Sequence, residues 1–498
     1  MGRQKESSYL HILKYTGLFG GVQGLSILIS IVRNKLVALI LGPQGLGLIS
    51  LFNSTVKLVS DSSNLGLSMS AVKNISEAYE TGDDERVARS ISTIRLWSFL
   101  TALVGTMLCV VLSPLLDKWT FNWGNHVLHF ILLSPIVGLI AITGGETAIL
   151  KGTRRLKTLA AISVLNVIMA LITSVPLYLL WGEKAIVPSL VIAALSQMLL
   201  TVWHSYRAHP LRLTANRLLF TEGYGMVRLG VAFVMAGILG SGADFIIRSY
   251  LNNVASLQEV GLFNAGYMMT MVYAGLVFSA MDTDFFPRLS AVNTDREQRN
   301  LEVNRQIEVS MLLISPMIVF FIISLPILLP LLYSHQFMPA IDMVQVMSLA
   351  LYFRAMKLPL SYIPLAKGDS VAYLFLEMIY DITIVIMVVF MFRSFGLKGA
   401  GFAITITGVL EYVLLLVFMR VKYGFRLSSG GVRYACLQIP LGLLAYVLVC
   451  YSSGLNYWII GLVLFLTSTC VSFIILHRKT SLWSILADKI NRRKSHRE

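Results

Sequence analysis

The sequence predicts an all-α membrane protein whose chain crosses the bilayer many times. Of its 498 residues, 56% are hydrophobic and only 13% are charged, and the mean hydropathy is +0.73. Soluble domains carry about 25% charged residues, so most of this chain is buried in something other than its own core. Uncharged runs such as 128–145 and 314–333 each have about the 20 residues that a helix needs to cross hydrocarbon. These runs are too long for the strands of a membrane barrel and lack their alternation.

Hydrophobic runs, read against the breaks between them, predict about fourteen transmembrane helices. An even number of spans places both ends of the chain on the same side of the membrane. The predicted limits are 12–41, 45–74, 91–116, 125–150, 158–181, 185–206, 223–250, 258–287, 307–333, 339–366, 370–393, 398–420, 433–452 and 456–477.

Basic residues gather in alternate breaks between these spans. The break at 151–157 reads KGTRRLK, and the breaks at 207–217, 288–305 and 420–433 and the tail at 478–498 are also rich in Lys and Arg, whereas SHQF and SSGLN contain neither. Positive charge marks the cytoplasmic side of a membrane protein, so both termini are predicted to be cytoplasmic. The net charge of +15 therefore reflects orientation and does not indicate a nucleic-acid partner.

The chain also repeats itself at a distance of about 215 residues. GLGLISLFN after the first span is matched by EVGLFNAGY after the seventh. ILKGTRRLK after the fourth is matched by PLAKGDSVAY after the tenth, and WGEKAIVPS after the fifth by FGLKGAGFA after the eleventh. Both copies start on the predicted cytoplasmic side, so the repeat is parallel, with a pseudo-two-fold axis along the membrane normal. That is the plan of a transporter with two six-helix lobes and a solute path between them.

This repeat predicts the domain organisation, with two extra C-terminal helices outside it. The predicted parts are an N-terminal lobe at 1–207, a cytoplasmic linker at 208–222, a C-terminal lobe at 223–422, spans 13 and 14 at 433–477 and a basic cytoplasmic tail at 478–498.

Charged residues inside the spans are the candidate functional residues, because a charge at mid-bilayer costs about 2.5–3.5 kcal/mol on insertion scales. In the second predicted span, polar residues recur at helical spacing and form one stripe. Lipid would not tolerate this stripe, whereas a water-filled cleft would. Its members are Asn53, Lys57, Asp61 and Asn64.

Further cations lie in other spans. Arg354 and Lys357 share a face at i, i+3, and Arg248 occupies a position in the repeat close to that of Arg33 and Lys35. Arg33 and Lys35 are two residues apart and cannot share a face. We expect Lys35 to face the cleft while Arg33 reaches the outer headgroups; the alternative is that both do so.

The acidic residues of the spans are fewer. Asp61, Asp244, Glu146 and Glu411 are candidates for ion coupling or for ion pairs with the cations, for example Lys57 with Asp61. Two other acidic residues, Glu377 and Asp381, could bind a coupling ion or lock the packing of the lobe, and we favour packing.

A cleft lined with cations would attract anions, and Lys and Arg suit phosphate oxygens. The sequence contains neither a GxxxxGK[ST] nucleotide motif nor a His or Cys cluster with metal-ligand spacing. We therefore expect no cofactor, with energy coupling to the membrane potential, H⁺ or Na⁺ left open. Outward movement of each negative charge releases about 2.3 kcal/mol per 100 mV when the inside is negative.

The stretch NKLVALILGPQGLGLISLF, the turn LAKGDSVAYLF and the six-plus-six plan resemble the Wzx-type, or O-antigen, flippases of the multidrug/oligosaccharidyl-lipid/polysaccharide (MOP) exporter superfamily. The likeness extends over roughly the first 420 residues. It implies a MATE-like, V-shaped transporter in the bacterial inner membrane that moves undecaprenyl-pyrophosphate-linked oligosaccharide to the periplasmic leaflet. Membrane lipids and other polysaccharide-assembly proteins are the implied partners. Such flippases carry a first-span lysine, which Lys35 matches, and the two extra spans are similar to those of the lipid II flippase branch.

Three other functions compete with this interpretation. A multidrug exporter of the same superfamily would need an acidic cleft for its cationic substrates. An oligosaccharide polymerase or ligase would be an enzyme acting on the same carriers, but it would need a sizeable outer loop, which the sequence lacks. A scramblase or structural membrane protein would not need the duplicated basic cleft. We therefore expect a transporter and not an enzyme.

Overall fold

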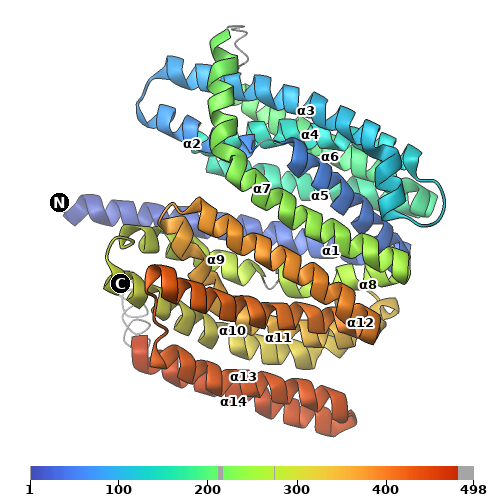
Figure 1. Ribbon diagram of the computed structural model, residues 1–498, viewed down its shortest axis with the longest axis vertical. Coiled ribbons are helices and arrows are strands. Elements are labelled where there is room, and N and C mark those ends of the chain that lie inside the picture. The colour runs from blue at the N-terminus through green and yellow to red at the C-terminus, as the bar shows by residue number, and fades with distance from the viewer. Residues whose placement is uncertain (1, 65, 211–216, 274, 481–498) are drawn as a thin grey trace, which may run out of the picture. The chain divides into compact units, whose positions relative to one another are not determined.

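The structure, a computed structural model, describes residues 2–64, 66–210, 217–273 and 275–480, and these are almost entirely helical, with no strand among them. Long helices run side by side within each part of the chain (Figure 1). Among these described residues, eight helical stretches are long and apolar enough to cross a membrane. The chain is thus a multi-pass helical membrane protein, and the predicted fold class is confirmed.

The chain folds into two compact units. The first contains the described residues up to Asn264 and the segment Leu331–Phe337, and the second contains Ala265–Pro330 and the described residues from Met338 onward. The predicted boundaries between lobes, linker and extra spans stay predictions. Part of the predicted linker, 211–216, and most of the basic tail, 481–498, lie outside the described residues.

Helices of the first unit occupy the first half of the sequence. They are α1 (Gly2–Ser63), α2 (Leu67–Glu80), α3 (Asp84–Thr120), α4 (Val127–Gly152), α5 (Leu156–Trp181), the short 3₁₀ turn η1 (Gly182–Ala185), α6 (Ile186–Ala208), α7 (Arg217–Val254) and the start of α8 (Leu257–Tyr267).

Helices of the second unit follow in the order of the chain. They are the end of α8, the π-helical turn η2 (Met268–Tyr273), α9 (Gly275–Ala291), α10 (Arg296–Leu332), α11 (Ile341–Ala366), α12 (Ser370–Tyr423), α13 (Ser429–Tyr451) and α14 (Gly454–Thr480), with the 3₁₀ turn η3 (His335–Ala340) before α11.

Predicted spans coincide with helical segments, with two departures. Helices α1 and α12 each contain two spans, separated by Gly42 at φ 64° and Gly396 at φ 59°, a backbone conformation that glycine adopts without strain. The predicted span 45–74 is too long, because α1 ends at Ser63 and a left-handed Gly66 precedes α2. The predicted span 258–287 is not one regular helix, because η2 interrupts it.

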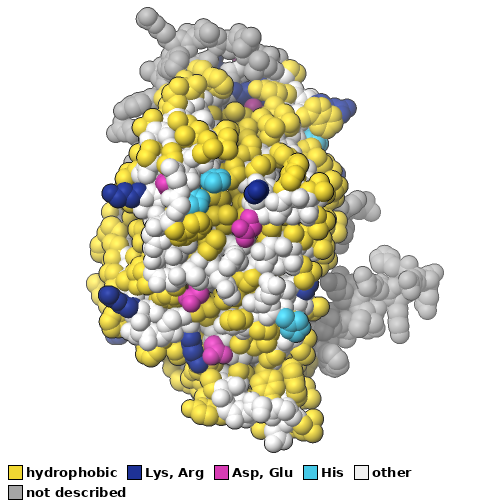
Figure 2. All heavy atoms as spheres, turned by 90° about the vertical axis from the view of Figure 1, so that its right-hand side faces the viewer, with side chains coloured by type: hydrophobic (Ala, Val, Ile, Leu, Met, Phe, Trp, Pro, Cys, Tyr) yellow, Lys and Arg dark blue, Asp and Glu magenta, His cyan; other side chains and the backbone are white. Residues whose placement is uncertain are grey.

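Much of the outward surface is apolar, as contact with lipid requires. Leu180 is 73% exposed, Val111 74% and Val421 82%. Figure 2 shows one face on which hydrophobic side chains predominate and Lys, Arg, Asp, Glu and His side chains are scattered. An extensive exposed apolar surface of this kind marks contact with a membrane or a partner rather than with water.

Gly47 and Gly261, which the repeat places in equivalent positions, lie against each other within the first unit. A Cβ atom on Gly47 would overlap the carbonyl oxygen of Leu257, and a Cβ atom on Gly261 would overlap that of Pro43. Any other side chain would push α1 and the start of α8 apart. The close approach of these two segments therefore requires glycine at both positions.

The extra helices α13 and α14 form a hairpin joined by a buried polar side chain. Gln438 donates from Nε2 to the carbonyl of Ser468 (3.2 Å) and to Oγ of Ser472 (2.9 Å), and its Oε1 accepts from Oγ of Ser468 (2.7 Å). Tyr457 of α14 donates to the carbonyl of Ile323 in α10 (2.5 Å). Hydrogen bonds between helices stabilise their association in lipid, where the hydrophobic driving force between helices is absent. The hydrogen bond of Tyr457 therefore holds the hairpin against α10 of its own unit.

Candidate functional site

The polar stripe predicted for the second half of α1 lies on an accessible face of the first unit. Asn53 and Lys57 are exposed, and Asp61 is half-buried, whereas Phe52 and Val56 are buried on the opposite face. Lys57 forms no ion pair with any residue that the structure describes, although its charge acts on Asp61. Its ammonium is therefore available to a ligand.

Arg33 and Lys35 behave differently from each other. Arg33 donates from Nε to Oγ of Ser174 in α5 (3.1 Å), close to the phenol of Tyr178. Ser174 and Tyr178 are fully or almost fully buried. The guanidinium of Arg33 is thus directed against α5 of its own unit, whereas Lys35 is half-buried and also interacts within the chain.

Arg248 is a buried packing residue, with 6% of its surface exposed. It forms an ion pair with Asp244 one turn earlier in α7 and donates from Nε to Oγ of Ser50 in α1 (2.6 Å). The ring of Phe263 lies 6.0 Å from its guanidinium carbon. These contacts occupy the guanidinium, so Arg248 joins α7 to α1; its proposed contact with substrate stays a prediction.

Glu146 belongs to a buried cluster of polar contacts between helices of the first unit. Arg95 of α3 donates to both carboxylate oxygens of Glu146 in α4, at 2.9 and 3.3 Å, and to the carbonyl of His209 after α6 (3.0 Å). Its guanidinium lies 3.9 Å from the ring centre of Tyr206. A bidentate pair of this kind fixes geometry strongly, so the contacts of Glu146 are those of an ion pair that connects α3, α4 and α6.

In the second unit, Lys357 of α11 forms an ion pair with Glu411 of α12, and the two side chains are 18% and 14% exposed. The ammonium of Lys357 also lies 4.3 Å from the ring centre of Tyr380. Sequence reasoning gave both residues as candidates but did not pair them. Their pairing joins α11 to both halves of α12.

Arg354, one turn before Lys357, contacts the π-helical turn η2. It donates from Nη1 to the carbonyl of Met271 (2.7 Å), and its guanidinium lies 5.2 Å from the ring centre of Phe278. π-Helical turns leave backbone groups out of register and are frequent at functional sites. Nothing in the sequence pattern indicated η2, which is the feature of this region that sequence reasoning missed.

Two more carboxylates lie within electrostatic range of this pair. The charges of Lys357, Glu377 and Glu411 all act on Asp381, which is 8% exposed. Together with Arg354 the cluster contains two cations and three carboxylates. This cluster therefore has no net positive charge, which differs from the cationic lining that the sequence suggested.

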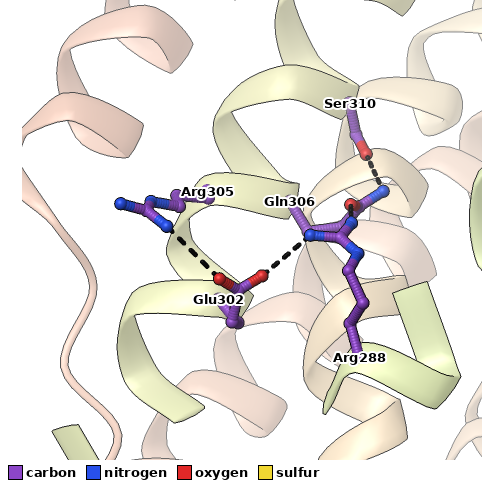
Figure 3. A network of polar contacts seen from close by, with 5 residues as sticks. All are labelled: Arg288, Glu302, Arg305, Gln306 and Ser310. Carbon is purple, nitrogen blue, oxygen red and sulfur yellow. Dashed lines mark hydrogen bonds and ion pairs between the residues drawn. The ribbon is translucent and has the colours of Figure 1, made fainter. Parts of the chain in front are cut away.

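A separate ionic network joins α9 to α10 in the second unit (Figure 3). Glu302 accepts from Arg288 (2.8 Å) and from Arg305 (3.3 Å), and Arg288 also reaches Oε1 of Gln306 (3.4 Å), whose amide contacts Ser310 (3.5 Å). These arginines belong to the basic break at 288–305. Part of that positive charge is therefore committed to a contact between helices.

The described part of the chain contains no group of three or more His, Cys, Asp and Glu side chains that could bind a metal ion. His126 and His129 pack as aromatic rings, His126 against Phe121 with ring centres 4.0 Å apart and His129 against Phe52 at 5.9 Å.

Solved structures share this fold. An inward-facing multidrug resistance MATE family transporter of the MOP superfamily aligns with a TM-score of 0.66 at 15% identity, covering 81% of this chain and 94% of that one. Lipid II flippase MurJ in an inward closed conformation aligns with a TM-score of 0.64 at 15% identity, covering 93% and 99%. A MOP superfamily transporter from Pyrococcus furiosus, described as having a binding pocket of reverse polarity, aligns with a TM-score of 0.52 at 15% identity, covering 82% of this chain and 94% of that one.

No curated protein is similar enough in sequence to match the chain. A family model does match it: residues 36–342 of the 498 fit the family described as polysaccharide biosynthesis protein. That match extends from the first kinked helix into the start of α11 and covers well over half of the chain. The chain belongs to this family of polysaccharide biosynthesis proteins.

Proposed function

We propose that the protein is a flippase that moves a lipid-linked oligosaccharide, with an undecaprenyl pyrophosphate carrier and an O-antigen-type or related surface-polysaccharide unit, from the cytoplasmic to the periplasmic leaflet. Two findings, taken together, support this proposal. A chain of a polysaccharide biosynthesis family shares its fold, over 93% of its length, with a structure named as a lipid II flippase. The protein would be a transporter rather than an enzyme, in the inner membrane with both termini cytoplasmic.

Lys57 is the residue that we propose to contact the pyrophosphate. Its ammonium is exposed and free of ion pairs among the described residues, and its neighbours Asn53 and Asp61 extend the polar face along the helix. A charged group without a partner inside a membrane helix is costly unless water or a ligand meets it. A phosphorylated headgroup would supply that partner and would be driven outward by the membrane potential.

The contact between Gly47 and Gly261 supports alternating access as the mechanism. These glycines start the second span of each repeat, on the side that the charge pattern predicts to be periplasmic. Their contact closes α1 against α8 there. Release of a substrate on that side requires this contact to open.

One observation favours a second candidate, an exporter of organic cations. The cluster around Lys357 has more carboxylates than cations, and the fold also matches a multidrug resistance transporter. Uptake of a fluorescent organic cation into proteoliposomes separates the two candidates, because a flippase of anionic lipid would show none.

The direct test replaces Lys57 with Ala in cells that make a surface polysaccharide and carry this gene as a single copy. We expect loss of most surface polymer and accumulation of the lipid-linked precursor in the inner leaflet, at normal protein level. The control is Lys73→Ala in α2, a lysine that is 62% exposed and 3.9 Å from Glu77. Normal polymer and no precursor accumulation in Lys57→Ala would refute the role of Lys57. Normal polymer after deletion of the whole gene would refute the function itself.

A further inference from the structure

Helices α4 and α6 of the first unit line an open cavity of about 300 Å³ that the proposed transport does not use. Small side chains, including Gly144, Ala148 and Ala194, provide its space. The polar side chains of Thr147, Lys151 and Gln197 project into the same cavity. The cavity therefore combines room for a ligand with groups that can bind one.

These polar groups are not used by the protein itself. Lys151 and Gln197 are exposed, and among the residues that the structure describes neither side chain has a hydrogen-bond or ion-pair partner. An amide that faces hydrocarbon without a partner is unfavourable, because no water is present to replace the lost hydrogen bonds. A bound polar group would remove that cost.

The depth of each group in the membrane indicates which ligand fits. Lys151 lies in the last turn of α4, next to the basic break that is predicted to be cytoplasmic. Gln197 lies about 16 Å before the end of α6, and Ile140 lies three turns deeper in the membrane than Lys151. The cavity thus presents a cation near the membrane surface. Amide and hydroxyl donors lie deeper in the membrane than this cation, and an apolar wall lies deeper still.

We propose that this cavity binds an anionic glycerophospholipid of the predicted cytoplasmic leaflet. Lys151 would contact the phosphate, Thr147 and Gln197 would donate to the ester carbonyls, and one acyl chain would lie along Ile140. Basic pockets between membrane helices on the cytoplasmic side bind anionic headgroups in this way. A polyprenyl phosphate matches Lys151 equally well, but its chain has no acceptors at the depth of Gln197.

The repeat shows that such a cavity is not forced by the fold. In the second unit the positions equivalent to Gly144 and Thr147 are Leu360 and Ile363, both fully buried. The position equivalent to Gln197 is Glu411, which is paired with Lys357. There the space is filled and the carboxylate is paired, so at these described positions the second unit has no counterpart of the cavity.

The test measures lipid binding to the purified full chain by native mass spectrometry and by the shift in thermal unfolding. We expect phosphatidylglycerol to bind and stabilise, and phosphatidylcholine to do so weakly. Lys151→Gln should weaken phosphatidylglycerol about fivefold, which corresponds to about 1 kcal/mol for one cation at a lipid phosphate. Gln197→Leu should weaken phosphatidylglycerol while leaving undecaprenyl phosphate unchanged.

Two controls make the test decisive. Lys157→Gln removes an exposed lysine of the same break outside the cavity and should change binding little. Lys151→Arg keeps the charge and should retain binding. This variant provides the comparison if Lys151→Gln proves unstable. Equal weakening by Lys157→Gln, equal binding of phosphatidylcholine, or a preference for undecaprenyl phosphate would overturn the proposal. None of these readouts depends on transport.

Discussion

One lysine in a helix of the first unit and one in a helix of the second unit have opposite surroundings. In the first unit, Lys57 is exposed without an ion pair among the described residues. In the second unit, Lys357 is largely buried and paired with Glu411, with the ring of Tyr380 beside it. The repeat has therefore preserved the helix plan, while the electrostatics of the two copies have diverged.

This difference separates residues available to a ligand from residues that stabilise the fold. A buried pair is neutralised within the protein, and removal of one partner leaves an uncompensated charge. An exposed cation has little effect on stability and can meet an anion that arrives from outside. The same substitution is therefore expected to have different consequences in the two units.

The largest expected effect is a difference in the free energy of unfolding between two variants, Lys357→Ala and Lys57→Ala. Lys357→Ala should lower the free energy of unfolding by about 3–5 kcal/mol, because it leaves the carboxylate of Glu411 buried and unpaired. Lys57→Ala should change that free energy by no more than about 0.5 kcal/mol. Unfolding of the purified protein in nanodiscs measures both.

Replacing both partners provides the control for this first prediction. Lys357→Met combined with Glu411→Leu removes both charges and should recover most of the lost stability. Equal destabilisation by the two single lysine variants would contradict the contrast between the units.

A smaller effect is expected where arginines bind polar groups. Arg354→Ala should lower the free energy of unfolding by about 1.5–3 kcal/mol, because the carbonyl of Met271 loses a charged donor at the π-helical turn. Arg33→Ala should lower the free energy of unfolding by less, since Oγ of Ser174 also donates a hydrogen bond to the carbonyl of Ala170. Hydrogen exchange should rise at 268–273 in Arg354→Ala only; unchanged exchange there would show that Arg354 does not hold the turn.

The local features of the molecule could be predicted from the sequence because they depend on neighbouring residues. The bilayer fixes the length of apolar runs, glycines at 42 and 396 fix the breaks, and helical spacing places Asn53, Lys57 and Asp61 on one face. The partners of the charges could not be predicted. Glu411 lies 54 positions after Lys357, and only the packing of helices brings them together.

Backbone irregularity escaped sequence analysis for a related reason. The turn η2 reads MMTMVY, an apolar run without glycine or proline, and nothing in it distinguishes a π-helix from an α-helix. Its carbonyl at Met271 is met by Arg354 from a helix 83 positions away. The shape of this part of the site is therefore set by tertiary contacts that no local pattern records.

The smallest effect concerns the turns that end the fourth span of each repeat, and it depends on pH. In the second unit, Asp369 accepts from Nζ of Lys422 (2.6 Å), Oη of Tyr423 (2.7 Å) and the amide of Ala372 (3.1 Å). These hydrogen bonds, that of Lys422 first, lower the pKa of Asp369 to about 2. The equivalent position in the first unit is Thr153, which has no charge.

A lowered pKa means that the folded state favours the carboxylate, so this stabilisation is complete above the ordinary pKa near 4 and disappears as the pH falls toward 2. Asp369→Asn should therefore lower stability by about 1 kcal/mol near neutral pH, since the amide retains one acceptor but loses the ion pair. Thermal unfolding at pH 6, 4 and 3 should show the gap between the wild type and this variant narrowing with acid. Thr153→Ala should show a gap that does not vary with pH, and a constant gap for Asp369→Asn would mean that the hydrogen bonds at this turn do not depend on the charge of the carboxylate.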